Sequence, residues 1–303
     1  MSKIVVFCGG ISPESQVSKV SGKYVFEALR KHFDAELVVL EQNRIPEGLN
    51  PKECVIVPAM HGDYGEDGTL QAELEAAGFS YAGCQSLSSR VCMVKPAAKA
   101  LMRFAGLPVA NSVDFCADNK PDAEAIARMF KKAVIKPADK GSSVGLVVAN
   151  TREQIKDAID GIKEGYWIVE EYVKGREFSM GVIDGKAAGL VEIIPDGGVY
   201  DFKRKYTAGA TRYEFPAKVP QETLKKMQIA AERAYEVCGC RDFARVDFLL
   251  EDADAAKFVI LELNTLPGMT PTSLLPKSAS CVGYTFEDLC AKMVENAQKR
   301  LVK

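Results

Sequence analysis

The feature that most constrains this chain is the segment Val259–Thr270, VILELNTLPGMT. Its first residues are β-formers and predict a strand, and side chains alternate between the two faces of a strand. Glu262 and Asn264 therefore project from the same face near the carboxyl end. Oxygen-bearing side chains so placed can bind Mg²⁺, which prefers oxygen ligands and accompanies phosphates. Leu266-Pro267-Gly268 then ends the strand in a turn that exposes backbone N–H groups beside the pair.

A second strand is predicted at Phe243–Leu250, with Arg245 and Asp247 on one face. A turn through residues 251–257 returns the chain to Val259, so we expect a hairpin that brings Asp247 near Glu262, within a residue of register. Two carboxylates repel each other unless a cation lies between them. A surface salt-bridge network with Arg245 is the alternative. The apolar flanking residues favour the metal, because unpaired acids are costly on a half-buried face.

The composition excludes several classes of function. The chain has 303 residues, 47% of them hydrophobic and 26% charged, which leaves room for two or three packed units. Its formal net charge is −2 without a basic block, so we expect no nucleic-acid partner and no membrane partner. No apolar run approaches the roughly 20 residues that span a bilayer. Nine scattered cysteines and two histidines indicate reduced thiols and a cytoplasmic location.

The N-terminal part reads as an open α/β unit with a buried parallel sheet. We expect strands at Ile4–Cys8, Ala35–Leu40 and Cys54–Ala59, and a helix from about Val17 to His32 that Ser12 and Pro13 introduce as N-cap and first residue. The turn GGISPES lacks the G-x-G-x-x-G spacing, which disfavours a dinucleotide site.

Two side chains of this unit follow strand ends. Glu14 comes after the first strand and His61 after the third. Ligands of such sheets bind beyond the carboxyl ends of the strands, so both are candidate site residues. A satisfied structural hydrogen bond is the alternative for His61.

The middle of the chain holds candidate phosphate-binding groups. A helix is predicted at Leu87–Ala105 and contains Lys95, and a strand at Ala133–Lys136 leads into the loop KPADKGSSVG before the chain resumes as a strand. N–H and hydroxyl groups of this loop can cover phosphate oxygens, and Lys136 supplies a charge for them. An ordinary hairpin connection is the alternative; the serine pair and Lys136 favour the flap.

Two later segments suit nucleotide recognition and closure. The predicted strand Tyr166–Tyr172 carries Glu170-Glu171, carboxylates that suit an adenine amino group and a ribose diol, although solvated acids are the commoner case. The polar excursion Tyr200–Tyr213 has the length of a lid.

Taken together, these segments resemble the ATP-grasp ligases and, among them, the D-alanine–D-alanine ligases, over nearly the whole chain. The markers are GGISPESQVS, MHGDYGEDGTLQ, KPADKGSSVG, EEYVKGREF, KYTAGATRY, RVDF and ELNTLPGMTPTSLLP. Each motif alone is weak, whereas several in the same order are specific.

The resemblance implies an ATP-grasp fold of the α/β class, with an α+β C-terminal half. Residues 1–83 would form the N-terminal open parallel-sheet domain on the substrate side. Residues 84–174 would form the central subdomain with the phosphate flap. Residues 175–303 would carry the lid, the metal site and the second-substrate site. The last two units would clamp ATP.

The resemblance also implies an activity: ATP-dependent joining of two D-alanines through a D-alanyl phosphate, with release of ADP and phosphate, for peptidoglycan precursor synthesis. It implies two Mg²⁺ or Mn²⁺ ions and a homodimer, and it leaves a monovalent-cation requirement open. The alternatives are another ATP-grasp carboxylate–amine ligase, of the D-serine, D-lactate or another dipeptide type, and a catalytically inactive ATP-binding protein.

The implied nucleotide and metal roles follow the motifs. Glu170 and the backbone of Val173 would bind the adenine, and Glu177 the ribose. The residues implied at the phosphates are Lys95, Lys136, Ser142 and Ser143, and those implied at the metals are Asp247, Glu262 and Asn264.

The amino acids would bind on either side of the metals. Glu14 and His61 would hold the first D-alanine, whereas Lys205, Ser273 and the N–H of Leu274 would hold the carboxylate of the second. The catalytic set implied is Glu14, Ser142, Tyr206, Arg245 and Gly268. Arg245 and the Gly268 N–H would stabilise an oxyanion, while Tyr206 would close the site through Ser142 and Glu14.

The sequence departs from the family pattern in three places. Gln16 replaces a frequent acid, Val94 stands where Asp is usual before Lys95, and Phe202-Lys203-Arg204 makes the lid more basic. None of them is a residue with an implied catalytic role.

Overall fold

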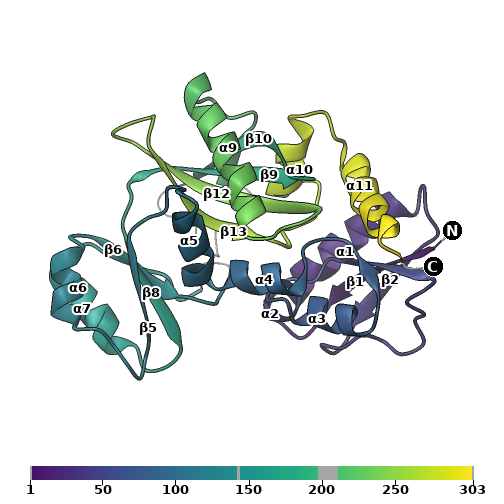
Figure 1. Ribbon diagram of the computed structural model, residues 1–303, viewed down its shortest axis with the longest axis horizontal. Coiled ribbons are helices and arrows are strands. Elements are labelled where there is room, and N and C mark those ends of the chain that lie inside the picture. Colours follow the sequence, from purple (N-terminus) through teal and green to yellow (C-terminus); the bar gives the residue numbers. More distant parts are fainter. Residues whose placement is uncertain (1, 142–143, 197–210, 302–303) are drawn as a thin grey trace.

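The computed structural model describes residues 2–141, 144–196 and 211–301. They form three sheets, each with its own helices, which lie side by side in an elongated molecule (Figure 1). One sheet is parallel and two are antiparallel, so the predicted α/β class with an α+β C-terminal half is confirmed.

The first sheet has the order β2-β1-β3-β4 and is parallel throughout. Its strands are β1 (Lys3–Gly9), β2 (Ala35–Leu40), β3 (Cys54–Pro58) and β4 (Ser80–Tyr81). The central strands β1 and β3 are almost wholly buried, which explains their continuous apolar sequences. The predicted strands of this unit are therefore confirmed.

The helices of this unit are α1 (Ser15–Leu29), α2 (Asp63–Glu66) and α3 (Thr69–Ala76). The predicted start of α1 is wrong, because Glu14 and not Ser12 is the N-cap. The hydroxyl of Ser12 instead donates to the carbonyl oxygen of His61 at 2.8 Å. It therefore ties the α1 entry to the loop after β3.

The single helix predicted at residues 87–105 is two helices, α4 (Ser86–Met93) and α5 (Lys95–Phe104). Val94 between them is extended, with φ −83° and ψ 93°. Pro96 has no N–H to continue the first helix, whereas proline is well tolerated in the first turn of a new one. The break places Lys95 at the first position of α5.

The second sheet is antiparallel with the order β5-β8-β6-β7. Its strands are β5 (Ser112–Cys116), β6 (Ala133–Pro137), β7 (Val147–Ala149) and β8 (Tyr166–Glu171). The helices α6 (Ala123–Met129) and α7 (Arg152–Gly161) cover one face (Figure 1). The loop between β6 and β7 is the predicted flap.

The third sheet is antiparallel with the order β11-β10-β9-β12-β13. Its strands are β9 (Gly175–Ile183), β10 (Lys186–Pro195), β11 (Thr211–Glu214), β12 (Phe243–Glu251) and β13 (Phe258–Asn264). The helix α9 (Gln221–Val237) packs on one face through an apolar core, and α10 (Leu274–Ser280) lies on the other.

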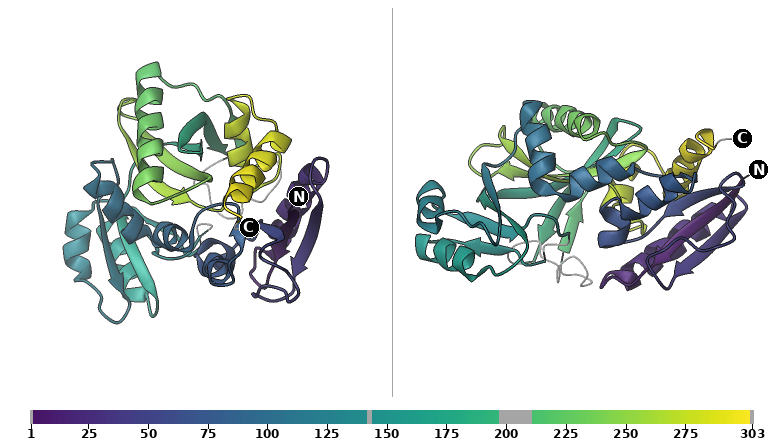
Figure 2. Two further views of the ribbon diagram at one scale, coloured as in Figure 1. Left: turned by 45° about the vertical axis from the view of Figure 1, so that its right-hand side comes forward. Right: turned by 60° about the horizontal axis from the view of Figure 1, so that its bottom comes forward.

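The last helix, α11 (Phe286–Lys299), returns to the first sheet (Figure 2). Its residues Leu289, Met293 and Ala297 belong to the same buried core as β1 and β3. Residues 286–299 thus pack with the N-terminal 83 residues, and the two termini lie near each other (Figure 1). The domain boundaries at 83 and 174 stay predictions.

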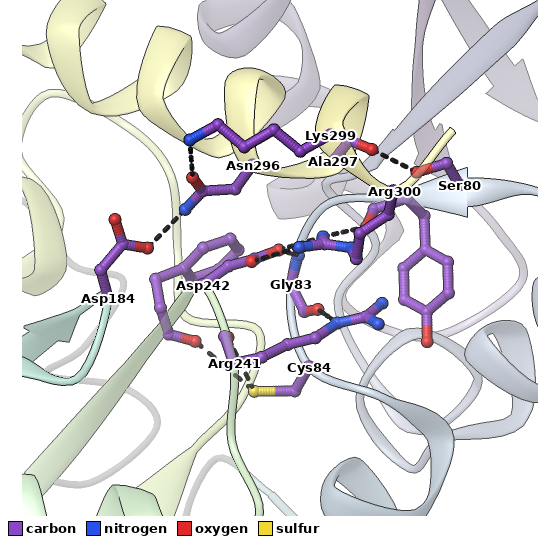
Figure 3. A network of polar contacts seen from close by, with 12 residues as sticks. Ser80, Gly83, Cys84, Asp184, Arg241, Asp242, Asn296, Ala297, Lys299 and Arg300 are labelled. Carbon is purple, nitrogen blue, oxygen red and sulfur yellow. Dashed lines mark hydrogen bonds and ion pairs between the residues drawn. The ribbon is translucent and has the colours of Figure 1, made fainter. Parts of the chain in front are cut away.

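A buried polar network joins α11, the first sheet and the start of β12 (Figure 3). Asp242 accepts from Arg300 Nη1 at 2.8 Å, from Arg300 Nη2 at 2.6 Å and from the Gly83 N–H at 2.8 Å. Arg241 Nε donates to the Gly83 carbonyl at 2.7 Å. The network connects three segments that are far apart in the sequence.

Among the described residues, no helix combines the length and the apolar character needed to cross a membrane.

Candidate active site

The hairpin of β12 and β13 brings the predicted metal ligands together. The two strands pair antiparallel, with Asp247 opposite Glu262 and Arg245 opposite Asn264. A register shift follows directly after Asp247. The predicted proximity of Asp247 and Glu262 is therefore confirmed.

Asp247 is buried and receives several hydrogen bonds. Arg245 donates from Nε to Oδ1 at 2.9 Å and from Nη2 to Oδ2 at 2.7 Å. Ser179 on β9 donates to Oδ1 at 2.7 Å, and Asn264 Nδ2 donates to Oδ2 at 3.0 Å. The salt bridge to Arg245 is thus present, but in a largely buried setting and not on the surface.

The donor set fits a hard cation. Asp247, Glu262 and Asn264 offer carboxylate and amide oxygens from paired strands, which is the ligand chemistry of Mg²⁺. No cluster of three or more His, Cys, Asp or Glu side chains suited to a metal occurs in the described ranges. The predicted set contains two carboxylates and one amide, so the metal assignment stays a prediction.

Three lysines and one glutamate form a charged group near this hairpin, and one of them, Lys95, lines the cleft beside it. Glu170 on β8 is buried, and its Oε2 lies 2.6 Å from Lys136 Nζ. Its other oxygen, Oε1, lies 2.6 Å from Nζ of Lys99 on α5. Lys95, one turn earlier on α5, donates from Nζ to the carbonyl oxygen of Lys140 at 2.5 Å. Lys95 therefore touches the base of the flap.

The charges of this group are mutually dependent. Burial alone would raise the pKa of Glu170, but Lys136 and Lys99 outweigh burial and lower this pKa to about 2. Burial would lower the pKa of Lys136, yet Glu170 and Glu262 leave that pKa raised. Burial dominates at Lys95 and lowers its pKa, although Glu262 opposes the effect. The carboxylates thus favour the charged form of Lys136, whereas burial disfavours the charged form of Lys95.

One cleft connects the β12–β13 hairpin to Lys95 and the flap. Its lining comes from α2, α4, α5, the flap and β13. The residues that matter for the site are Glu66, Lys95, Gly141, Glu262 and Asn264. The structure therefore brings together groups that are up to 198 positions apart in the sequence, Glu66 and Asn264 being the extremes of this set.

The predicted first-substrate residues lie near each other in the segments that follow β1 and β3. An added Cβ at Gly62 would lie 3.4 Å from the Glu14 carboxylate, so this side chain reaches the His61 loop. His61 is buried, with Nε2 2.9 Å from Ser21 Oγ and Nδ1 3.3 Å from Glu66 Oε1. The structural hydrogen bonds considered as the alternative for His61 are therefore present, and its substrate role stays a prediction.

The predicted second-substrate residues surround the turn before α10. Ser273 is the N-cap of α10 and accepts from the Thr270 N–H at 3.0 Å. An added Cβ at Gly268 would lie 3.1 Å from Ser273 Oγ, so the turn is tight there. Leu274 opens the helix and is buried. Gly268 and Ser273 are neighbours, as the combined site requires.

The predicted adenine side lies where β8 passes into β9. Val173 follows β8, Glu177 lies on β9, and both are half-buried. Glu177 contributes to the raised pKa of Lys136, after Glu170 and Glu262. Ser142 and Ser143 of the flap, and Lys205 and Tyr206 with the lid residues 200–210, lie outside the described residues. Residues 211–213, which the predicted lid also included, belong to strand β11.

Two residues of the site were missed in the sequence. Lys99 lies four residues after Lys95 on one helix face, and this spacing is the signal that could have found it. Ser179 contacts Asp247 from a neighbouring strand 68 positions away, which no local pattern indicates.

Comparisons with known proteins identify the family to which this chain is similar. The family model described as D-ala D-ala ligase C-terminus matches residues 101–295. A D-alanine--D-alanine ligase of Acidiphilium cryptum (strain JF-5) is 39% identical and covers 99% of this chain and 100% of its own. One from Mannheimia succiniciproducens is 37% identical, with 97% of each chain covered.

Solved structures agree with this assignment. The D-alanine--D-alanine ligase from Bacillus anthracis complexed with ATP has a TM-score of 0.86 at 26% identity, over 99% of this chain and 98% of that one. The VanG D-Ala:D-Ser ligase from Enterococcus faecalis has a TM-score of 0.83 at 28% identity, over 98% and 99%. The fold is thus that of an ATP-grasp ligase. The chain belongs to the D-alanine–D-alanine ligase family.

Proposed function

We propose that the protein joins two molecules of D-alanine to D-alanyl-D-alanine at the expense of ATP, with release of ADP and phosphate, and so supplies peptidoglycan precursor synthesis. The observation that carries this function is the β12–β13 register, which sets Asp247 opposite Glu262 in a hairpin that shares its cleft with the buried Lys95. Family membership over 99% of the chain supports the same reaction.

The proposed chemistry begins with the first D-alanine. Its carboxylate is a poor electrophile, so it first takes the γ-phosphoryl group of ATP, and ADP leaves. Lys95 and Lys136 provide positive charge for the phosphates. Asp247, Glu262 and Asn264 would hold two Mg²⁺ or Mn²⁺ ions, which neutralise charge on the phosphates.

The second step forms the amide bond. The amine of the second D-alanine attacks the acyl phosphate carbon, and phosphate leaves. Arg245 and the Gly268 N–H are assigned to the developing oxyanion, where preorganised donors act best. Arg245 pairs with Asp247 in this structure, so this role would require the guanidinium to turn from that carboxylate towards the reacting oxygen.

The remaining assignments belong to the same proposal. Glu14 and His61 bind the first D-alanine; Ser273, the Leu274 N–H and Lys205 bind the second. Glu170 and Val173 face the adenine, and Glu177 binds the ribose. Ser142 and Ser143 belong to the phosphate flap, and Tyr206 belongs to the lid. We also propose that the chain has the three domains described above, that it forms a homodimer and that it is located in the cytoplasm.

An ATP-dependent coupling assay tests the function. Purified protein with ATP, Mg²⁺ and D-alanine should release ADP and phosphate in equal amounts and form the dipeptide. D-serine and D-lactate compete in parallel reactions, because one of the structural relatives is a D-Ala:D-Ser ligase. ADP release with L-alanine but not with D-alanine would contradict the proposal.

Glu262→Gln tests the metal assignment separately. The amide keeps the shape of the side chain but loses the charge, so turnover should be abolished while the circular dichroism spectrum and melting temperature stay close to those of the wild type. Chelation with EDTA should stop the wild-type reaction, and added Mg²⁺ or Mn²⁺ should restore it. Phosphate release at the wild-type rate by the variant would refute the metal ligand.

A further inference from the structure

Lys99 is a buried charged group to which the proposed reaction gives no role. The whole residue is only 1% exposed, and its side chain is among the largest fully buried ones of the described residues. It lies on α5, one helical turn after Lys95. Its ammonium group lies 2.6 Å from Glu170 Oε1.

Glu170 holds a lysine on each oxygen. Lys136 occupies Oε2 at 2.6 Å, so one buried carboxylate faces two ammonium groups. Three charges in this arrangement sum to +1. Such a group has one more cation than its carboxylate needs, so one lysine can leave without stranding a buried negative charge.

The two lysines differ in what they can reach. The Lys136 side chain is 12% exposed, lies at the end of β6 where the flap begins, and also experiences the charges of Glu262 and Glu177. The Lys99 side chain is 2% exposed and is enclosed on α5. Lys136 is therefore the more accessible of the two lysines and lies beside the flap, whereas Lys99 is enclosed.

We propose that Lys99 is a positioning residue: it is the permanent counter-ion of Glu170 and thereby frees Lys136 to exchange Glu170 for the phosphates of ATP. This inference rests on the proposed function, since it needs ATP in the cleft. When Lys136 moves to a phosphate, Lys99 keeps Glu170 charged and oriented. Without Lys99, the departure of Lys136 would leave the buried Glu170 carboxylate unpaired. The Lys136–Glu170 ion pair would then compete with the binding of Lys136 to the phosphates.

The exchange also frees an acceptor. Oε2 of Glu170 loses its lysine and becomes available to the amino group of the adenine assigned to it above. The purine and the phosphates are then recognised by linked contacts, with Lys99 fixing the carboxylate between them. Lys99 thus affects the binding of ATP without touching it.

The test is a double-mutant cycle on ATP affinity, measured by calorimetry without amino acid substrate. Lys99→Met keeps the length and apolar stem of the side chain but removes its charge. We expect it to weaken ATP binding by about tenfold or more, the usual effect of truncating one partner of a buried charge pair. In the steady state the KM for ATP should rise more than kcat falls, because at saturating ATP Lys136 is again bound to the phosphates.

Removal of the carboxylate should abolish the need for Lys99. In a Glu170→Gln background, adding Lys99→Met should change ATP affinity by no more than about threefold, close to the scatter of independent effects. This comparison also serves if Lys99→Met alone does not fold, as judged by thermal melting. A tenfold loss in both backgrounds, or in neither, overturns the role of Lys99.

The control is Lys156→Met. Lys156 pairs with Glu124 at 3.1 Å, but both side chains are more than 40% exposed, so its loss should leave ATP affinity unchanged. Wild-type protein that does not bind ATP would overturn the proposed function itself. Wild-type protein that binds ATP as tightly as Lys99→Met would overturn only the inference.

Discussion

Glu170 stays ionised at a place where an isolated carboxylate would be protonated. Burial works against its charge, and two lysines on opposite oxygens reverse that effect. The negative charge of Glu170 and the positive charges of Lys99 and Lys136 stabilise each other, so removal of Glu170 destabilises the charged forms of both lysines, and removal of either lysine destabilises the charged form of Glu170. The consequence for the whole chain is a dependence of stability on pH.

Glu170→Gln should destabilise the protein most at neutral pH. The pKa of Glu170 is about 2 in the folded protein against an ordinary value of 4.5, so the folded state binds fewer protons between these values. Its stabilising effect is therefore complete above about pH 4.5 and is lost as the pH falls towards about 2. We expect the variant to lose about 3 kcal/mol at neutral pH, as when one partner of a buried pair is removed.

Urea unfolding of the wild type and the variant at several pH values measures this difference. The gap should narrow steadily below about pH 4.5. Glu171→Gln is the matched control, because the adjacent carboxylate is exposed and its loss should matter by less than about 0.5 kcal/mol. A gap of constant size across the pH range would mean that the charge of Glu170 is not what the fold needs.

At the scale of elements, α10 owes its position to two glycines. Gly181 on β9 and Gly189 on β10 face the helix. An added Cβ would lie 2.6 Å from Leu275 Cδ1 at Gly181 and 2.1 Å from Cys281 Cβ at Gly189. Ser278 joins the two strands, since its Oγ accepts from the Gly181 N–H at 2.8 Å and donates to the Gly189 carbonyl. The helix therefore lies against the sheet at a distance that any larger residue would increase.

Gly181→Ala should push α10 away from β9. Overpacking of this kind costs about 1–3 kcal/mol. Because Ser273 and Leu274 begin the helix, the KM for the second amino acid should rise more than the KM for ATP. Melting curves and initial rates at varied D-alanine and ATP measure both effects. Gly161→Ala is the control, because its added Cβ meets no atom within 4 Å. Equal KM changes for both substrates would contradict this position-specific effect.

Elements whose signals are local could be predicted from the sequence. The β12–β13 hairpin followed from alternation and a short turn, and with it the pairing of Asp247 and Glu262. The break at Val94 was missed, although Pro96 is a local signal for the start of a new helix. Lys99 was missed because its partner lies on β8, so its environment depends on tertiary packing.

At the scale of the molecule, the chain closes on itself through α11. The sequence of residues 286–299 does not indicate that they pack against the first sheet. An amphipathic helix can bury its apolar face against any apolar surface of the protein, so its pattern does not identify the partner. The partner is specified by Asp242, which lies at the start of β12 and accepts from Arg300 and Gly83 at once (Figure 3). The N-terminal unit is thus attached to the ATP-binding part at a buried charge as well as by apolar contacts.

Arg300→Leu should loosen this attachment. The Asp242 side chain is 4% exposed, so loss of its arginine leaves a buried carboxylate with little compensation and should cost about 3 kcal/mol. Arg233→Leu is the control: it removes an arginine–carboxylate pair of the same 2.6 Å length, but Arg233 and Glu236 are 49% and 68% exposed, and about 0.5 kcal/mol is expected. Denaturant unfolding gives both values, and limited proteolysis should cut the Arg300 variant faster between the first sheet and α4. Losses of equal size in the two variants would show that burial does not make the difference, and that apolar packing of α11 alone holds the N-terminal unit in place.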